Sequence, residues 1–229
     1  MCGRVTQTDK DLPGIKVAVL DEHYDSRTGE LVPQARYNGA PGQDFWVIRR
    51  HPKTGAYHRS RLKWGFIPSW VKEPNGGRKP VNARAETLTT LPSFRGAYAK
   101  RRALLPIDNF FEWMTIKTGP KRPYAIAMKS GEPFALAALW ESWRHPATGE
   151  IVRTFCVITT QANELLAQIH DRMPVIIPPQ AYDRWLSPLE PDPRDLLAPY
   201  PAEPMTMWPI SSRVNSPKND DPAILDPLI

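Results

Sequence analysis

The second residue of the chain is a cysteine, and its position carries more information than its type. Initiator methionine is usually removed when the next side chain is small, so Cys2 is expected to become the first residue. A terminal cysteine offers an amine that titrates at about 7.7 to 8.0 and a thiol that titrates near about 8.5. The amine can form an imine with an aldehyde, and the adjacent thiol can then close a five-membered thiazolidine. The alternative is that Cys2 is merely a small buried hydrophobic residue.

Two further residues could transfer protons in such a reaction. Glu112 lies among aromatic residues, and burial there would raise the pKa of its carboxyl; the expected neighbours are Phe110, Phe111, Trp113 and, if the strands pair, Trp140. A surface glutamate paired with lysine or arginine is the alternative. His170 follows an expected helix and can donate or accept a proton near neutral pH, although a histidine in such a place is often structural.

An aromatic run offers stacking surfaces. Trp64, Phe66 and Trp70 lie beside Pro68 in a segment that suits the stacking of bases. Because the chain has 8 tryptophans, several of them must belong to the core. We expect Trp70 to be the exposed one.

The elements that must position these residues are short. The chain has 26 prolines in 229 residues, which disfavours long helices and central strands. Strand-forming residues and Gly-bearing turns at 51–55 and 145–149 predict antiparallel hairpins. The expected strands cover residues 45–48, 102–105, 124–128, 136–143 and 154–159. The expected helices are Ala162 to Ile169, which ends just before His170, then Pro179 to Leu186 and one turn at Arg194 to Leu197.

We expect one domain over residues 1–229, with a Pro-rich connector near 187–193 and an extended C-terminal strap over 215–229. The predicted fold class is α+β, with an antiparallel, barrel-like β core and a few short helices. Cys2 and Cys156 lack CxxC spacing, so neither a disulfide framework nor a zinc ribbon is predicted. No run reaches the roughly 18 apolar residues of a membrane span. A cytoplasmic protein is expected, associated with the nucleoid if it is bacterial.

The net charge of +6 permits an anionic partner. Basic residues gather in two clusters, which are Arg49, Arg50, Lys53, Arg59, Arg61 and Lys63, and then Arg95, Lys100, Arg101 and Arg102. A solvated basic surface without a partner is an equally simple explanation.

Several polar clusters in order along the chain resemble one family. After Met1-Cys2-Gly3-Arg4 they are Arg36 to Gly42, Trp64-Gly65-Phe66-Ile67-Pro68, Asn82-Ala83-Arg84-Ala85-Glu86-Thr87, Phe110-Phe111-Glu112-Trp113, Ile169 to Pro174 and Val214 to Asn219. This order is similar to that of SRAP proteins, the SOS-response-associated peptidases, over nearly the whole chain. The resemblance implies a sensor of abasic sites in single-stranded DNA that joins its N-terminal cysteine covalently to the sugar aldehyde. It also implies a monomer with no metal and no organic cofactor.

The resemblance implies a role for each matching residue. Cys2, Asn82, Glu112 and His170 would form the catalytic group, with Asn82 holding the sugar or the amine. Arg4, Arg84 and Arg172 would grip phosphates. Asn38, Pro41 and Thr159 fall in segments similar to the strand-binding loops of the family, and Trp70 would contact bases. From the residues alone, Asn82, Asn38 and Pro41 are equally explained as turn residues, Thr159 as a strand end, and Arg4 or Arg84 as an anchor for a structural carboxylate.

Two departures from the family pattern concern loops. The stretch Asn75 to Lys79 lengthens the connection before Asn82, and Asn109 stands where the family commonly has glycine. Two rival functions are a cysteine peptidase, with Cys2 as nucleophile, His170 as base and Asn82 or Glu112 orienting it, and a non-covalent single-strand binding module.

Overall fold

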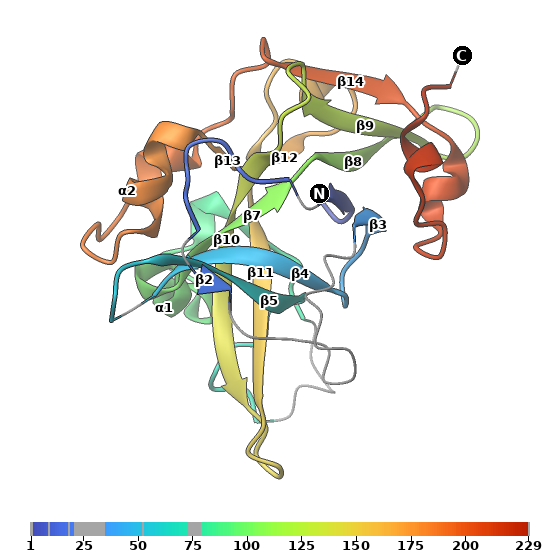
Figure 1. Ribbon diagram of the computed structural model, residues 1–229. Helices are drawn as coiled ribbons and strands as arrows, with labels where there is room; N and C mark the ends of the chain where they lie inside the picture. Colours follow the sequence, from blue (N-terminus) through green and yellow to red (C-terminus); the bar gives the residue numbers. More distant parts are fainter. Residues whose placement is uncertain are drawn as a thin grey trace.

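Five strands close into a barrel at the centre of the computed structural model, which describes residues 2–8, 10–17, 19–20, 35–51, 53–72 and 79–228 (Figure 1). The strands are β4 (Asp44–Arg50), β5 (Tyr57–Trp64), β7 (Arg102–Ile107), β10 (Phe134–Arg144) and β11 (Ile151–Gln161). Neighbours in the order β11-β10-β7-β4-β5 pair antiparallel. A parallel contact between β11 and β5, with Phe155 opposite Trp64, closes the ring.

Short strands extend the barrel sheet, and a second sheet packs against it. The extensions are β2 (Val19–Leu20), β6 (Asn82–Arg84), β12 (Arg172–Pro174) and β13 (Ile176–Ile177). The second sheet has the order β14-β9-β8-β1-β3, with β14 (Met205–Pro209), β9 (Arg122–Met128), β8 (Asn109–Met114), β1 (Val5–Gln7) and β3 (Arg36–Gly39). The N-terminal residues therefore enter the structure between β3 and β8.

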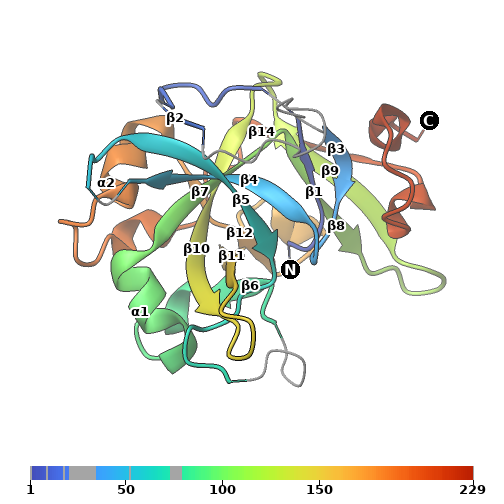
Figure 2. The same cartoon turned by 60° about the horizontal axis from the view of Figure 1, so that its bottom comes forward.

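Aromatic side chains fill the interior of the barrel. Phe45 contacts Trp64 edge to face, with ring centroids 5.5 Å apart, and Trp64 stacks on Phe155 at 5.9 Å. Cys2 and Val5 belong to the same buried cluster. Alternate residues of the barrel strands point outward, where they meet the helices α1 (Pro92–Lys100) and α2 (Tyr182–Leu186). The helices lie on one side of the molecule and the C-terminal segment on the other (Figures 1 and 2).

The remaining helical elements are single 3-10 turns: η1 (Ala85–Thr87), η2 (Leu166–Gln168), η3 (Pro179–Ala181), η4 (Arg194–Leu197), η5 (Ser212–Asn215) and η6 (Pro222–Leu225). Within the described ranges, the helices are too short or too polar to cross a bilayer.

The predicted fold class is confirmed, as are the five expected strands and both hairpins. The expected helix over 162–169 is wrong, because only η2 forms there. Its start is occupied by a local turn, in which the Asn163 side chain accepts the Leu166 N–H at 2.9 Å and donates to the Tyr200 carbonyl at 2.7 Å.

The structure differs from the sequence predictions at three other places. The sequence did not predict α1, which is the longest helix among the described residues. The segment from 215 packs against the body of the protein but is not extended throughout, because η6 forms within it. Trp140 does not lie on a strand beside Glu112, because β8 pairs with β1 and β9 while Trp140 pairs with Phe155 in the barrel.

Candidate active site

The register between β1 and β8 places Glu112 beside the N-terminus. Val5 lies opposite Phe110, and the Phe111 N–H donates to the Arg4 carbonyl at 3.0 Å. In an antiparallel pair this register sets Glu112 opposite the residue that follows Cys2. Cys2 and Glu112, which are far apart in the sequence, therefore lie on neighbouring segments of the sheet.

Cys2 and Glu112 are both buried there, with exposures of 0% and 2%. Burial raises the pKa of the Cys2 thiol, and the negative charge of Glu112 raises it further. Weaker opposing effects come from the positive charge of the N-terminal amine and from the backbone of Arg4, which hydrogen-bonds the sulfur. The thiol therefore stays protonated at neutral pH. The burial of Glu112 also excludes the alternative of a surface glutamate.

Strand β6 brings Asn82 and Arg84 to the same place. It runs parallel to β11, with Asn82 opposite Val157 and Arg84 opposite Thr159, and Ala83 between them is buried on the other face. The Asn82 amide donates to the Cys2 carbonyl at 2.8 Å. Its Oδ1 is buried and accepts no hydrogen bond from any residue in the described part of the chain. Asn82 thus holds the N-terminal backbone with one end and keeps a free acceptor at the other.

His170 follows η2 and is fixed by its own backbone neighbours. Its Nδ1 accepts the Arg172 N–H at 2.9 Å, and an Asp171 carboxylate oxygen lies 3.0 Å from the same nitrogen. One nitrogen cannot accept the first hydrogen bond and donate to Asp171 at the same time. The neutral ring, with its proton on Nε2, satisfies the backbone N–H, whereas a protonated ring would pair with Asp171. Both protonation states of His170 therefore have a partner.

Arg172 is held by a carboxylate that sequence reasoning did not single out. Its two terminal nitrogens donate to the two Glu86 oxygens at 2.5 and 3.0 Å, and Nη2 also donates to the Thr159 carbonyl at 2.7 Å. The hydrogen bond from Arg172 holds the pKa of Glu86 below its usual range. Glu86 lies in the same short motif as Asn82 and Arg84, but nothing in the motif indicates its partner.

A surface hollow of about 750 Å³ lies beside His170 and Arg172. Its lining includes Met114, which is the last residue of β8, together with Thr115, Gln161, His170 and Arg172. The hollow therefore brings His170 and Arg172 to the same surface as the residues that follow Glu112 at the end of β8.

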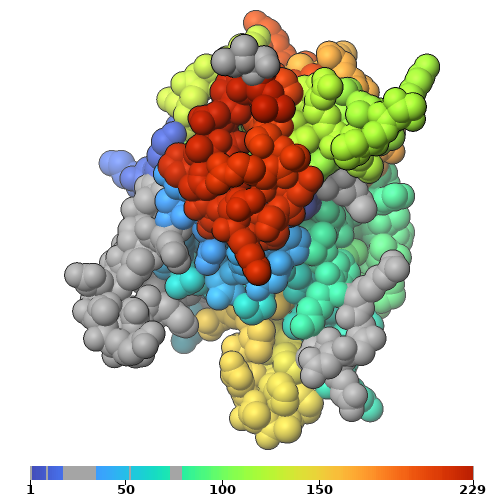
Figure 3. All heavy atoms as spheres, turned by 90° about the vertical axis from the view of Figure 1, so that its right-hand side faces the viewer, coloured from blue at the N-terminus to red at the C-terminus, as the bar shows by residue number. Residues whose placement is uncertain are grey.

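Arg4 is supported by the C-terminal segment. Its Nη1 donates to Asn38 Oδ1 at 2.6 Å and to the Val214 carbonyl, and its guanidinium lies 5.9 Å from the Trp113 ring centre. Burial lowers the pKa of Arg4. The Asn38 amide donates to the carbonyls of Ser216 and Asn219 at 2.9 and 2.8 Å. The space-filling view shows this red segment covering one face between β3 in blue and the β8–β9 hairpin in green (Figure 3).

The remaining residues expected to contact DNA divide into two groups. Trp70 is 64% exposed, which confirms its expected exposure, whereas Trp64 and Phe66 are core residues. Pro41 is exposed in the turn after β3, and Arg84 is exposed at the end of β6. Asn38 and Thr159 have no exposed surface, and their polar atoms are used by neighbouring segments. In this arrangement these two residues support Arg4 and Arg172.

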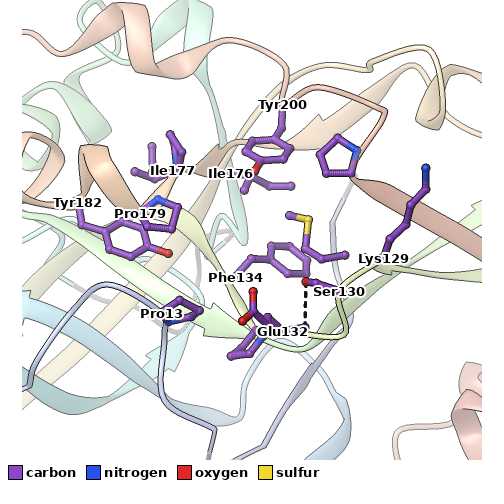
Figure 4. A pocket seen from close by; sticks show the side chains of 14 residues that line it. Pro13, Lys129, Ser130, Glu132, Phe134, Ile176, Ile177, Pro179, Tyr182 and Tyr200 are labelled. Carbon is purple, nitrogen blue, oxygen red and sulfur yellow. Dashed lines mark hydrogen bonds between the residues drawn. The ribbon is translucent and has the colours of Figure 1, made fainter.

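A second hollow has a different chemistry. It measures about 220 Å³ and is lined mainly by apolar side chains, among them Phe134, Ile176, Tyr182 and Tyr200 (Figure 4). Burial raises the pKa of the Tyr182 hydroxyl. None of the expected site residues lines this hollow, so the candidate active site lies instead around Cys2, Asn82 and Glu112, with His170 and Arg172 in the larger hollow.

Proteins of one family are similar to this chain over nearly its whole length. The profile of the family described as SOS response associated peptidase (SRAP) matches residues 1–217. The abasic site processing protein YoqW of Bacillus subtilis (strain 168) is 40% identical over 230 residues, which cover 99% of each chain. YoaM of the same organism, also named an abasic site processing protein, is 39% identical over 99% of this chain and 98% of its own. A crystal structure of a protein from Bacteroides thetaiotaomicron matches with a TM-score of 0.76 and 29% identity, over 85% of this chain and 86% of that one.

Proposed function

This chain belongs to the SRAP family, and on that premise we propose that it processes abasic sites in single-stranded DNA by binding them covalently through Cys2. The observation that carries the proposal is the meeting of Cys2, Glu112 and Asn82 at the N-terminus, with a buried thiol and a hydrogen bond from Asn82 to Cys2. The reaction begins once Met1 has been removed, because only then is the Cys2 nitrogen a primary amine.

The reaction has two steps. The ring-opened sugar presents an aldehyde at C1′, which the Cys2 amine attacks to form a carbinolamine and then, with loss of one water, an imine. The thiol then adds to the imine carbon: the S–C bond forms, the S–H proton moves to nitrogen, and a thiazolidine results. The raised pKa of the thiol favours this order, because a protonated thiol leaves the amine as the first nucleophile.

Glu112 and His170 divide the proton transfers. Glu112 lies close enough to Cys2 to affect its titration, so it can accept a proton from the attacking amine and later from the thiol. His170 lies in the open hollow beside Arg172, where it can donate a proton to the sugar ring oxygen as the ring opens. The unused Oδ1 of Asn82 can accept a hydrogen bond from the amine or from a sugar hydroxyl.

The strand is held by cations and by one aromatic side chain. Arg84 is exposed and can bind a phosphate directly, whereas Arg172 must share its guanidinium with Glu86. Arg4 is half-buried beside Trp113 and reaches the strand only from its fixed position. Trp70 offers an exposed ring on which a base can stack.

General peptidase activity is less well supported. A cysteine peptidase requires a thiolate, and both burial and the charge of Glu112 oppose its formation at Cys2. The Nδ1 atom of His170 also accepts the Arg172 N–H and lies beside the Asp171 carboxylate, so these neighbours orient the ring.

The test is a denaturing gel of the protein incubated with a single-stranded oligonucleotide that carries one abasic site. We expect a heat-stable shifted band with the wild type and none with undamaged DNA. Cys2→Ala should lose the stable band but keep an imine that borohydride can trap, because its terminal amine remains. Cys156→Ala is the matched control for loss of a buried thiol and should crosslink normally.

A protein that retains Met1 should form neither product. The proposal is wrong if the wild type gives no stable band, or if Cys2→Ala gives an equally stable one.

A further inference from the structure

The two basic clusters of the sequence meet at one cavity that the proposed reaction does not use. The cavity measures about 570 Å³ and lies between the turn after β4, the end of α1, the start of β7 and the segment after α2. Figures 1 and 2 both place the β4–β5 turn and α2 on the side of the molecule away from the N-terminus. None of the residues assigned to the DNA site lines it.

The rim of the cavity is cationic. Its lining includes five lysine and arginine side chains, and none of the described lining residues is acidic; the five are Arg50, Lys53, Lys100, Arg101 and Arg102. Arg102 is occupied by four backbone carbonyls, and Arg101 pairs with Glu141 at 2.7 Å. Arg50, Lys53 and Lys100 form no ion pair with any residue that the structure describes. This surface therefore favours a ligand with several negative charges.

The walls of the cavity are apolar. Leu186 is buried and Trp140 half-buried, while Leu189 is 90% exposed although it is a large aliphatic residue. The Arg49 guanidinium lies 4.2 Å from the centre of the Trp140 ring and fixes one of its faces. An exposed leucine at the edge of a concave apolar surface is typical of a site that holds an apolar side chain.

We propose that this cavity docks an acidic peptide segment of a partner protein, with an apolar anchor side chain inserted between Trp140 and Leu189 and carboxylates on Arg50, Lys53 and Lys100. Charge complementarity and the aliphatic walls carry the inference. Stacking of successive bases in a single strand uses several flat aromatic faces, and this cavity has one tryptophan, whose ring is covered by Arg49 on one side. The volume of the cavity, about 570 Å³, suits one or two side chains of a peptide.

The probe is a fluorescein-labelled peptide with the sequence Asp-Asp-Asp-Leu-Pro-Phe, titrated with the full-length protein and followed by anisotropy. Binding should weaken by about tenfold in the Lys53→Glu/Lys100→Glu double variant, because two exposed attractions become repulsions. Leu189→Ala should weaken it through the loss of apolar contact. Lys121→Glu changes an exposed lysine elsewhere and is the matched control, with binding expected to change less than twofold.

Two further arms separate the alternatives. A peptide with Asn in place of Asp, and one with Ala in place of Phe, should each bind more weakly than the parent peptide. An undamaged single-stranded oligonucleotide should bind the double variant nearly as well as the wild type. The proposal is overturned if the wild type does not bind the acidic peptide, if the pocket variants bind it unchanged, or if they lose the oligonucleotide instead. Crosslinking to abasic DNA, measured on the same variants, should be unchanged, so the outcome is independent of the proposed function.

Discussion

Replacing Asn38 with alanine should destabilise the protein and loosen Arg4 together. The Asn38 side chain is fully buried and makes two strong donated hydrogen bonds, at 2.9 and 2.8 Å, and accepts one from Arg4 at 2.6 Å. A third acceptor, the Val214 carbonyl at 3.2 Å, shares the same amide group. At about 1 kcal/mol for each of three hydrogen bonds, the expected loss in the free energy of unfolding is about 3 kcal/mol.

Urea denaturation followed by tryptophan fluorescence measures this loss. Asn219→Ala is the matched control, because it removes one exposed side-chain hydrogen bond from the same C-terminal segment and keeps the carbonyl that Asn38 uses. We expect less than about 1 kcal/mol for the control. The reasoning is refuted if Asn38→Ala costs no more than the control. Asn38→Ala should also bind single-stranded DNA more weakly, because Arg4 loses one of the two acceptors that fix it.

Three further predictions concern the site itself. Glu112→Gln, which keeps the size of the side chain but not its charge, should slow crosslinking by about 100-fold in a gel time course; an unchanged rate would exclude Glu112 from proton transfer. Glu86 has a lowered pKa, so it stabilises the folded state above its unfolded pKa and loses this effect as pH falls through the lowered folded value. In Glu86→Gln the urea midpoint should therefore decline less on acidification. The same substitution frees Arg172 and should tighten binding to single-stranded DNA. Weaker binding would contradict the competition between Glu86 and phosphate for Arg172. Trp70→Ala should weaken that binding by about 1 to 3 kcal/mol with no change in stability, and normal affinity would show that the exposed ring does not stack on DNA.

The strands were predictable because local rules decide them. The turns at 51–55 and 145–149 place glycine at positive φ, with +72° at both Gly55 and Gly149, and β-forming residues flank each turn. The two His-Pro-x-Thr-Gly segments also share one geometry, in which the histidine Nδ1 accepts two backbone N–H groups. Local chemistry of this kind can be read from a sequence.

The helices were less predictable because their signals are weak or are overridden by other contacts. The spacing of Leu165, Leu166 and Ile169 indicates a helix, but the Asn163 side chain and its bond to Tyr200 replace the first turn. In α1 the opposite occurs: Gly96 interrupts the pattern, and the helix forms because Phe94, Ala97 and Tyr98 pack against the barrel.

The candidate site also has a part that could be predicted from the sequence and a part that could not. The prediction that Cys2, Asn82 and Glu112 come together rested on the family resemblance, and the register of β1 with β8 and of β6 with β11 gives it a physical basis. The pairing of Arg172 with Glu86 and the burial of Asn38 under residues 214–220 depend on contacts between distant segments. No local pattern encodes such contacts.

Identification of the linkage atoms in the purified conjugate tests the central claim most directly. After digestion of the protein and the oligonucleotide, tandem mass spectrometry should find the sugar on the Cys2 peptide, with the mass of the two components less one water. Borohydride should add no hydrogen to it, and iodoacetamide should not alkylate Cys2, because both its nitrogen and its sulfur are bonded to C1′. A sugar attached to another residue, or a Cys2 thiol that still reacts with iodoacetamide, would contradict the account.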